Sequence, residues 1–294
     1  MFRDKDYVQT IDHLTFSVLG YYHPEDGVTA GLKYINGNKW TCGYFEAQDF
    51  LAANFPHYVT DRIIVPRERI ARHFHPHERF AELMESPPHA RCLHRLALDL
   101  AKTISDQLEI PLTAFGLTDS LLWGEGGPQS DIDLVIYGTH YCGRFYDRAE
   151  SLWLLDQFQP EQSRHVQRPP HLTDADFQRL CLRKFNQGHY QGVRYCVRGV
   201  LEENEFGTLV SAFSPCDYVE QVTTITDCLY SLMFPVVYGT AADIPLVSFH
   251  VGYEGTLRPG DHVAVRGTME CNGQSKRMVV GSTTRRAESI RLIV

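Results

Sequence analysis

The sequence lacks several patterns that would assign a protein to a class directly. No apolar run approaches the roughly 20 residues that cross a bilayer as a helix. The first residues, "MFRDKDYVQT", lack the apolar segment of a secretory signal. Internal repeats and low-complexity linkers are also missing. These absences predict a soluble, cytoplasmic protein with no membrane partner.

Cysteines are present, but they are not arranged as a metal or disulfide motif. They are scattered, with no Cys-x-x-Cys pair and no histidines at the spacing of a zinc finger. In a cytoplasmic protein such cysteines are reduced, and most are buried as small apolar side chains. The sequence therefore predicts free thiols and no disulfide framework for the eight cysteines, Cys42, Cys92, Cys142, Cys181, Cys196, Cys216, Cys228 and Cys271.

Basic residues are outnumbered, which limits the partners that composition alone would favour. Lysine and arginine number 28 against 36 aspartates and glutamates, for a formal net charge of −8. This balance argues against a general basic coat for nucleic acid, although a local basic groove remains compatible with it. With 294 residues, 43% of them hydrophobic, the chain has the composition of a globular protein of roughly two or three domains.

The residue pattern changes twice along the chain, which divides it into three regions. Residues 1–86 mix strand-like segments ("HLTFSVLGYY", "VTAGLKYI") with helix-like ones ("EAQDFLAANF", "PRERIARHF"). Residues 87–204 mix both patterns, and residues 205–294 are short strands between Gly, Pro and Asn turns. We therefore expect an α+β protein with a small N-terminal α+β unit, a central α/β layer and a C-terminal β-rich, barrel-like domain.

A histidine cluster follows the second helix-like segment of the first region. Pro66 suits the first position of a helix over "PRERIARHF", and "HFHPHERF" (73–80) overlaps its end. Pro76 breaks the i, i+4 pairing by which helical histidines share a metal ion, and the neighbouring sequence completes no zinc shell. We therefore interpret residues 73–80 as a solvated helix junction rather than a metal site.

The most informative stretch is "FGLTDSLLWGEGGPQSDIDLVIYG" (115–138), where two aspartates flank an isoleucine at the start of an apolar run. That run is β-branched and aromatic and ends at Gly138, so it predicts a strand. Residues i and i+2 of a strand share a face, so Asp131 and Asp133 aim two carboxylates at one small volume. Like charges this close repel each other unless a cation or a shared proton separates them.

A divalent ion between Asp131 and Asp133 would relieve this repulsion. Oxygen ligands that leave positions open for substrate phosphates suit Mg²⁺ or Mn²⁺. Upstream of the pair, Ser120 lies at a predicted strand-to-helix turn, where a hydroxyl and free backbone N–H groups can hold phosphate oxygens. Carboxylates beside such a turn are the apparatus of metal-dependent phosphoryl or nucleotidyl transfer.

The 115–138 stretch resembles the nucleotidyltransferase (DNA polymerase β-like) superfamily, whose signature is Gly-Ser, a loop, and Asp-x-Asp at the start of a strand. The chain is similar to prokaryotic proteins with such a domain in the middle, and the likeness covers about residues 88–200. It implies a mixed sheet with helices behind it, two divalent metal ions and a nucleoside triphosphate. By position, Ser120 matches the signature serine, and Asp131 and Asp133 match the catalytic, metal-binding pair.

Two departures from this signature bear on activity. Asp119 stands where the family has glycine; aspartate tolerates a left-handed backbone, but its charge opposes a triphosphate. The strand predicted beside the aspartates, "GVRYCVRGVL" (192–201), contains no third carboxylate. The preferred function is transfer of a nucleoside monophosphate from a triphosphate to an acceptor hydroxyl of RNA, protein or a small molecule. A catalytically inactive nucleotide- or nucleic-acid-binding module is the alternative.

Cations gather in "RKFNQGHYQGVRYCVR" (183–198), beside the predicted acidic strand. Lys184, Arg194 and Arg198 are candidates for binding the triphosphate or a polynucleotide backbone, and Arg194 and Arg198 share a strand face. Ion pairing with the abundant acidic residues is the structural alternative for these side chains. Trp123, after Ser120, can stack on a base, although packing is its simpler role.

Overall fold

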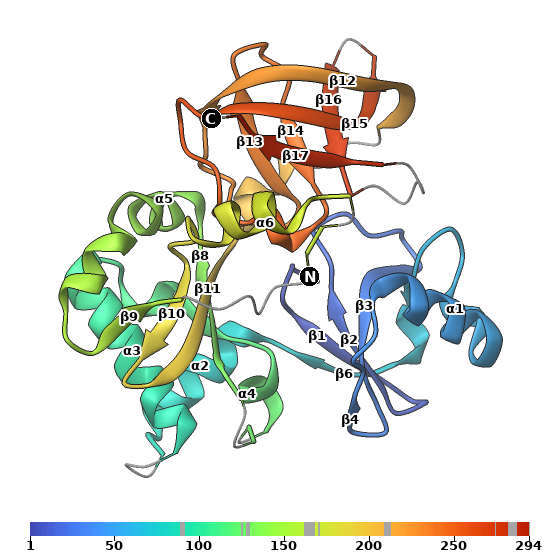
Figure 1. Cartoon of the computed structure of the whole chain (residues 1–294). Coiled ribbons are helices and arrows are strands. Elements are labelled where there is room, and N and C mark those ends of the chain that lie inside the picture. Colours follow the sequence, from blue (N-terminus) through green and yellow to red (C-terminus); the bar gives the residue numbers. More distant parts are fainter. Residues whose placement is uncertain are drawn as a thin grey trace.

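Three sheets and their helices make up the molecule, which confirms the expected α+β class (Figure 1). None of the described helices has both the length and the apolar character that a membrane span requires. The structure is a computed structural model that describes residues 1–88, 92–124, 126–127, 130–161, 168–169, 171–208, 213–273, 275–281 and 287–293.

The N-terminal region contains one sheet, whose strands are β1 (Tyr7–Thr10), β2 (Leu14–Val18), β3 (Gly27–Ile35), β4 (Asn38–Lys39), β5 (Ile64–Pro66) and β6 (Ile70–Phe74). Their order is β4-β3-β2-β1-β6, and β5 pairs with β3. Helix α1 (Tyr44–Asn54) confirms the helix predicted from "EAQDFLAANF", and it buries Ala47 and Leu51 in the core of this unit.

The prediction of a helix over "PRERIARHF" is wrong. Pro66 ends β5, a short 3₁₀ turn follows, and residues 70–74 form β6. Strand β6 pairs antiparallel with β1, with Val8 opposite His73, so an interstrand ladder replaces the expected helical hydrogen bonds. Helix α2 begins only at Pro76 and ends at Glu85, so the proline that opens a helix here is Pro76.

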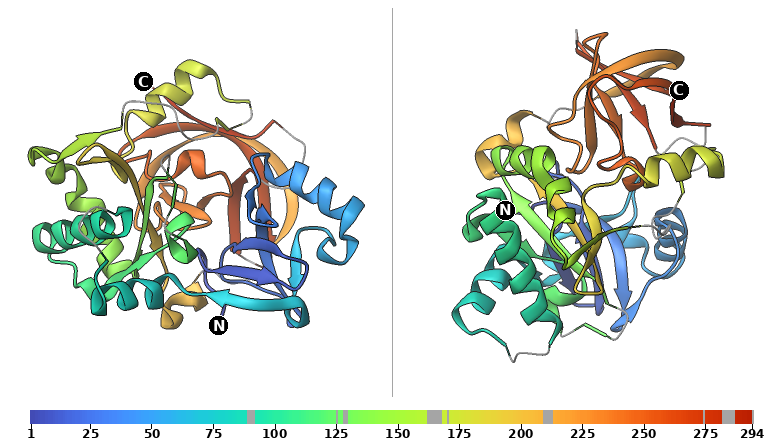
Figure 2. Two further views of the ribbon diagram at one scale, coloured as in Figure 1. Left: turned by 90° about the horizontal axis from the view of Figure 1, so that it is seen from below. Right: turned by 60° about the vertical axis from the view of Figure 1, so that its left-hand side comes forward.

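The central sheet consists of β7 (Phe115–Leu117), β8 (Ile132–Tyr137), β9 (Phe158–Pro160), β10 (Gln187–Tyr190) and β11 (Val193–Val200). Its order is β7-β8-β11-β10-β9, and it is mixed, because β8 and β11 are parallel whereas the other pairs are antiparallel. Helices α3 (Leu93–Leu108) and α5 (Thr139–Arg148) lie on the side of this sheet away from the N-terminal sheet (Figures 1 and 2).

The helical segments of the central region follow the sequence pattern with one change. The amphipathic helix predicted after Pro88 is α3, and α6 (Asp174–Cys181) opens at Thr173, whose hydroxyl accepts a hydrogen bond from the Asp176 N–H. The segment "YDRAESLWLLDQF", predicted as one helix, is instead the end of α5 followed by a 3₁₀ helix over Ala149–Leu154.

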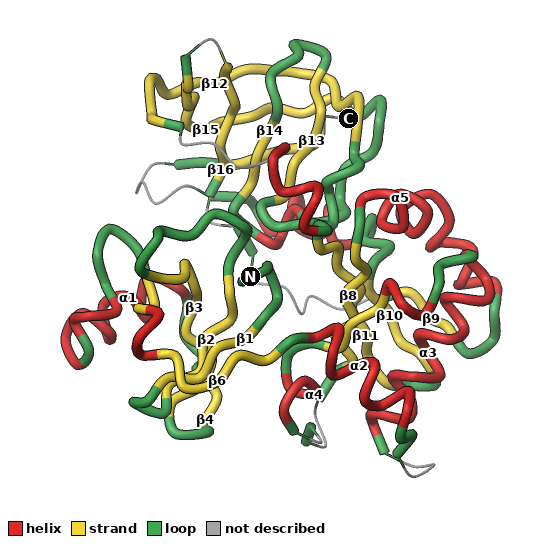
Figure 3. The backbone as a smooth tube through the Cα atoms, turned by 180° about the vertical axis from the view of Figure 1, so that it is seen from behind, coloured by secondary structure: helices red, strands yellow, loops and turns green. Residues whose placement is uncertain are grey.

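The C-terminal region is a six-stranded sheet that lies across one end of the other two units (Figure 3). Strand β12 pairs with β13 on one side and with β15 on the other. The strand predicted from "GTLVSAF" (207–213) falls largely outside the described residues. The strands are β12 (Ser214–Asp227), β13 (Val236–Thr240), β14 (Leu246–Ser248), β15 (His262–Asn272), β16 (Ser275–Val280) and β17 (Ser289–Leu292).

Buried apolar side chains form three clusters that follow the three sheets. The division is not strict, because Phe177 and Leu180 of α6 pack into the C-terminal cluster. In the opposite direction, Leu232 and Met233, which follow β12, pack into the central cluster. Side chains therefore cross the junction between the central and C-terminal units both ways, and burial couples these units.

Long-range hydrogen bonds fix the N-terminal unit against the central sheet. The hydroxyl of Thr118 donates to the carbonyl oxygen of Lys5 at 2.9 Å. The hydroxyl of Tyr21 accepts from the Leu201 N–H, also at 2.9 Å, across 180 residues of sequence. Both bonds are buried, so the N-terminal unit and the central sheet are held in a defined relative position.

A disulfide between Cys216 and Cys271 corrects the prediction that all eight cysteines are reduced. These residues lie on the paired strands β12 and β15, where Ser214 is opposite Cys271 and a register shift follows Pro215. Pairing over a sequence separation of 55 residues leaves no spacing motif in the sequence. The other six cysteines are free, and three of them, Cys142, Cys196 and Cys228, are buried as expected.

The disulfide predicts a thiol count. Protein purified without reductant and then unfolded should take up an alkylating reagent at six cysteines, and at eight after reduction. Cys216→Ser should lower the free energy of unfolding by about 2–4 kcal/mol, because the bond restricts the unfolded chain. Mass spectrometry and urea unfolding measure both effects, with Cys42→Ser at an exposed free cysteine as the control. Eight alkylated cysteines before reduction would contradict the bond.

Candidate functional site

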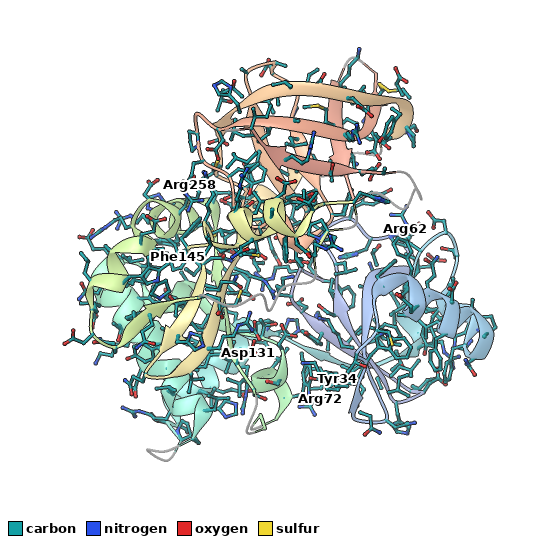
Figure 4. All side chains as sticks on the ribbon, in the orientation of Figure 1. Tyr34, Arg62, Arg72, Asp131, Phe145 and Arg258 are labelled. Carbon is teal, nitrogen blue, oxygen red and sulfur yellow. A yellow bond between two sulfur atoms is a disulfide. The ribbon has the colours of Figure 1, made fainter. Side chains whose placement is uncertain are left out.

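Two aspartates mark the beginning of β8. Asp131 precedes the strand and is partly exposed, whereas Asp133, inside it, is only 8% exposed. Their spacing places both side chains on one face of the strand, as the sequence predicts. Figure 4 shows Asp131 on the side of the central sheet that faces the N-terminal sheet, from which Tyr34 approaches.

The neighbouring strand β11 presents arginines to this face. Because β8 and β11 are parallel and Cys196 is opposite Asp133, Arg194 and Arg198 lie on either side of that position. Arg194 donates a short hydrogen bond to Asp131 through Nη1 and a second one, of 3.1 Å, to Glu161 through Nε. The predicted meeting of an acidic and a basic strand is therefore present.

Arg198 lies among three carboxylates. Its Nη1 is 4.0 Å from Asp133 Oδ1 and 3.8 Å from Asp119 Oδ2, and its Nε is 3.4 Å from Glu254 Oε2. The positive charge of the guanidinium therefore lies among the negative charges of three acids. Asp133 is in β8, Asp119 precedes α4, and Glu254 is in the segment after β14. The pKa of Arg198 is held well above its usual value, with the nearby Cys196 thiol and Glu254 and Asp133 carboxylates among the groups that raise it.

Asp119 adopts a positive φ of 53° immediately before α4 (Ser120–Trp123). Its Oδ1 accepts a short hydrogen bond from the hydroxyl of Tyr7 in β1, and Lys33 of β3 lies 3.9 Å away. Burial alone would raise the pKa of Asp119, but Lys33 and Arg198 together with the Tyr7 bond hold it below its usual range. The negative charge of Asp119 is thus matched by nearby cations.

The carboxyl group of Asp133 is not neutralised by cations to the same extent as that of Asp119. Burial raises the pKa of its carboxyl, and the charges of Asp119 and Asp131 raise it further, to about 8, against the opposing effect of Arg198 and Arg194. In the absence of another cation, Asp133 therefore holds a proton at neutral pH. The repulsion by Asp131 that the Asp-x-Asp pattern predicted contributes to this raised pKa, after burial and the charge of Asp119.

The other two predicted site residues, Lys184 and Ser120, lie in different parts of the structure. The amino group of Lys184 is buried and donates to the carbonyl oxygens of Glu254, at 2.8 Å, and Val251, at 3.3 Å. Burial lowers the pKa of Lys184. Ser120 is the first residue of the short helix α4, directly after Asp119. The structure thus brings Asp131, Asp133, Arg194 and Arg198 together, and it directs Lys184 toward the segment after β14.

Several residues of the site were not found by sequence reasoning. Glu161 and Glu254 bind the two arginines, and Tyr7 and Lys33 bind Asp119. They come from other units or from distant segments, so no local spacing indicates them. Trp123 packs its ring 4.7 Å from that of Tyr7 and 5.0 Å from that of Tyr34, in agreement with its simpler predicted role.

A separate group of side chains of the types that bind metal ions lies in the N-terminal unit. Among the described residues, Asp6, His73 and His75 bring their ligand atoms within 4.8 Å of one another. The interpretation of residues 73–80 as a helix junction missed this group, because it assumed a helix where the structure has β6. On a strand, histidines two residues apart share a face, and that spacing is the signal that was available.

Comparison with known proteins finds a similar protein, but that protein has no stated activity. No family model matches the sequence, and no solved structure matches it. An uncharacterized protein of Methanocaldococcus jannaschii is 24% identical over 326 aligned positions, which cover 96% of each chain. The similarity extends through all three units, and the name of that relative states no substrate or reaction.

Asp133 is predicted to make the metal-free protein less stable as the pH rises. Its carboxyl keeps a proton in the folded protein up to a pKa of about 8, whereas in the unfolded chain it ionises near 3.8. Its contribution to stability is therefore complete below the lower value and is lost as the pH approaches the upper one. Between them, the free energy of unfolding should fall by on the order of 1 kcal/mol per pH unit from this group.

Urea unfolding across this pH window, in the presence of a chelator, measures the slope. Asp133→Asn should remove this contribution, whereas Asp49→Asn, at an exposed position of α1, should keep it. Identical slopes for the wild type and Asp133→Asn would contradict the raised pKa.

Proposed function

We propose that this face of the central sheet binds a nucleoside triphosphate with a divalent metal ion and transfers a nucleoside monophosphate to an acceptor hydroxyl. The observation that carries the proposal is the Asp131–Asp133 pair on one face of β8, faced by the two arginines of β11. A carboxylate pair and guanidinium groups together offer ligands for a metal ion and for phosphate oxygens.

The arrangement of the chain around the pair supports a nucleotidyltransferase-like fold. Strand β7, the turn at Asp119, helix α4 and strand β8 follow one another in the order that the signature requires. The two strands belong to a mixed sheet that has helices α3 and α5 on one side (Figure 2). We also propose that the C-terminal sheet is barrel-like, since β12 pairs with both β13 and β15, and that this domain presents the acceptor.

The donor groups fit Mg²⁺ or Mn²⁺. Asp131 and Asp133 supply hard oxygen ligands, and burial beside Asp119 leaves Asp133 short of positive charge. When bound, such an ion neutralises the pair and polarises the phosphate that is transferred. Asp133 would then be ionised, and Arg194, which now binds Asp131, would have a second acceptor in the phosphate oxygens.

Aromatic side chains beside the pair offer a surface for the base. Tyr34 and Trp123 are partly exposed and make an edge-to-face contact, with ring centroids 5.0 Å apart. Stacking on such rings is independent of base identity, so this surface accommodates any of the four bases. The proposal therefore names a triphosphate as the donor and leaves the acceptor open among RNA, protein and small molecules.

A binding-only module is the second candidate, and a specific observation favours it. Strand β11 places Arg194, Cys196 and Arg198 beside β8, at the positions where a third carboxylate would assist the metal ions. Incubation with labelled triphosphates, Mg²⁺ or Mn²⁺ and total RNA or cell extract separates the candidates. A covalently labelled product supports the transferase, and saturable binding without any product supports the module.

Asp131→Asn with Asp133→Asn is predicted to abolish ligand-dependent stabilisation. A ligand that binds only the folded state raises the melting temperature, so the wild type should melt higher with Mg²⁺ and triphosphate than without them. The double variant keeps side-chain oxygens for the arginines but loses both charges, and it should show no such shift. Glu220→Gln, an exposed acid paired with Arg266, is the control and should respond as the wild type does. No shift of the wild type with any triphosphate and either metal would refute the function.

Arg194→Ala is predicted to weaken triphosphate binding and to flatten its dependence on salt. The side chain lies next to Asp131 on the exposed side of the pair, so its loss removes one cation from the phosphate-binding face. Binding is measured by titration at several salt concentrations, with Arg266→Ala as the control far from the site in sequence and on β15. Unchanged affinity and salt dependence would assign Arg194 a purely structural role.

A further inference from the structure

Three metal-binding side chains meet beside the N-terminal sheet. His73 lies in β6 and His75 just after it, while Asp6 immediately precedes β1, the strand that pairs with β6. The Nε2 atom of His73 is 2.9 Å from Asp6 Oδ2, and the Nδ1 atom of His75 is 3.9 Å from the same oxygen. The sheet therefore brings together residues that are almost 70 positions apart in sequence.

The carboxylate of Asp6 is incompletely satisfied. Its side chain is fully buried, and Oδ2 accepts hydrogen bonds from the Arg3 N–H and from His73. Its other oxygen, Oδ1, is buried and has no hydrogen-bond partner in the described part of the chain. A buried carboxylate oxygen without a partner is costly, so this position calls for a cation or another donor.

The separations suit one metal ion. An ion bound tetrahedrally at about 2.1 Å from each ligand atom places those atoms about 3.4 Å apart. The ligand atoms of the three residues lie between 2.9 Å and 4.8 Å from one another, so small side-chain rotations close the site. Two imidazoles and one carboxylate favour a transition metal such as Zn²⁺ or Fe²⁺, whereas Mg²⁺ and Ca²⁺ prefer oxygen ligands alone.

We infer that Asp6, His73 and His75 form a site for one divalent transition-metal ion, separate from the aspartate pair on β8. Three protein ligands leave coordination positions open. The histidine side chains are 19% and 25% exposed, so water or an external ligand reaches those positions. The site is thus accessible from solvent on the histidine side and closed on the aspartate side.

Neighbouring groups order the ligands and direct nearby positive charges to other partners. The ring of Phe2 stacks on His73 with centroids 4.4 Å apart, and the guanidinium of Arg67 lies over the ring of Phe2. The Arg3 guanidinium lies over the ring of Tyr137 and 3.9 Å from Glu202. Each of these arginines thus has a ring partner that is not a ligand of the site, and Arg3 also has an acidic partner in Glu202.

The site is also connected to the acidic face of the central sheet. Asp6 is followed by Tyr7, whose hydroxyl binds Asp119. A metal ion held by Asp6 and β6 would fix the start of β1 and thereby the position of the Tyr7 hydroxyl. The ion bound here thus positions a group that contacts the proposed nucleotide site without itself touching that site.

Cobalt titration of the full chain tests the inference. After removal of metals with a chelator, the wild type should bind Co²⁺ at this site, in addition to any ion at the aspartate pair of β8, and the near-ultraviolet spectrum should lack the charge-transfer band of cysteine ligands. His75→Gln should weaken this binding by about 100-fold or more, since even changes next to a ligand cost about 10–100-fold. His73→Gln provides a second test. Because His75 is partly exposed, its replacement disturbs the fold less than replacement of the buried Asp6 would, and neither experiment changes Asp6.

Two controls separate this site from the others. His140→Gln, at an exposed histidine, should bind Co²⁺ as the wild type does. The Asp131→Asn/Asp133→Asn variant should also keep it, so this test is independent of the nucleotide site. Zn²⁺ alone should raise the melting temperature of the wild type and not that of His75→Gln. Absence of Co²⁺ binding, a cysteine charge-transfer band, or equal affinity in His75→Gln would each overturn the inference.

Discussion

Charge balance around Arg198 is the constraint on which the junction of the three units depends. This arginine of β11 faces Asp133 of β8, Glu254 of the C-terminal unit, and Asp119, which in turn binds Tyr7 of the N-terminal sheet. Removing one partner of such a charge group is destabilising, because it leaves the other charges uncompensated. A single guanidinium therefore stabilises the positions of groups from all three units.

The same balance bears on the proposed function. Burial and the charges of Asp119 and Asp131 act against ionisation of Asp133, and Arg194 of β11 has an oxygen partner in Asp131. Under the proposal, a metal ion would supply positive charge to the carboxylates and a triphosphate would supply oxygen partners to the arginines, so their joint binding would disturb the junction less than either alone. Asp119 is tolerated in this setting because Lys33 and Arg198 already neutralise it.

Sequence patterns predicted the parts of the molecule that depend on local information. The aspartate strand, the amphipathic α3 and the Thr173 cap were found because periodicity and capping act within a few residues. The segment 66–74 was misjudged because pairing with β1, some sixty residues away, overrides its helical preference. The disulfide and the contact of Arg198 with Glu254 were missed for the same reason, since segments distant in sequence form them.

The hydrogen bond between Tyr21 and Leu201 affects how the chain folds during its synthesis. The N-terminal sheet leaves the ribosome first, yet Lys5 meets Thr118 only after the first part of the central unit has been made, and Tyr21 meets Leu201 only after nearly all of it. Closing such long loops costs entropy before the contacts repay it, which slows folding. The first unit synthesised thus reaches its final position against the central sheet only after that sheet has been made.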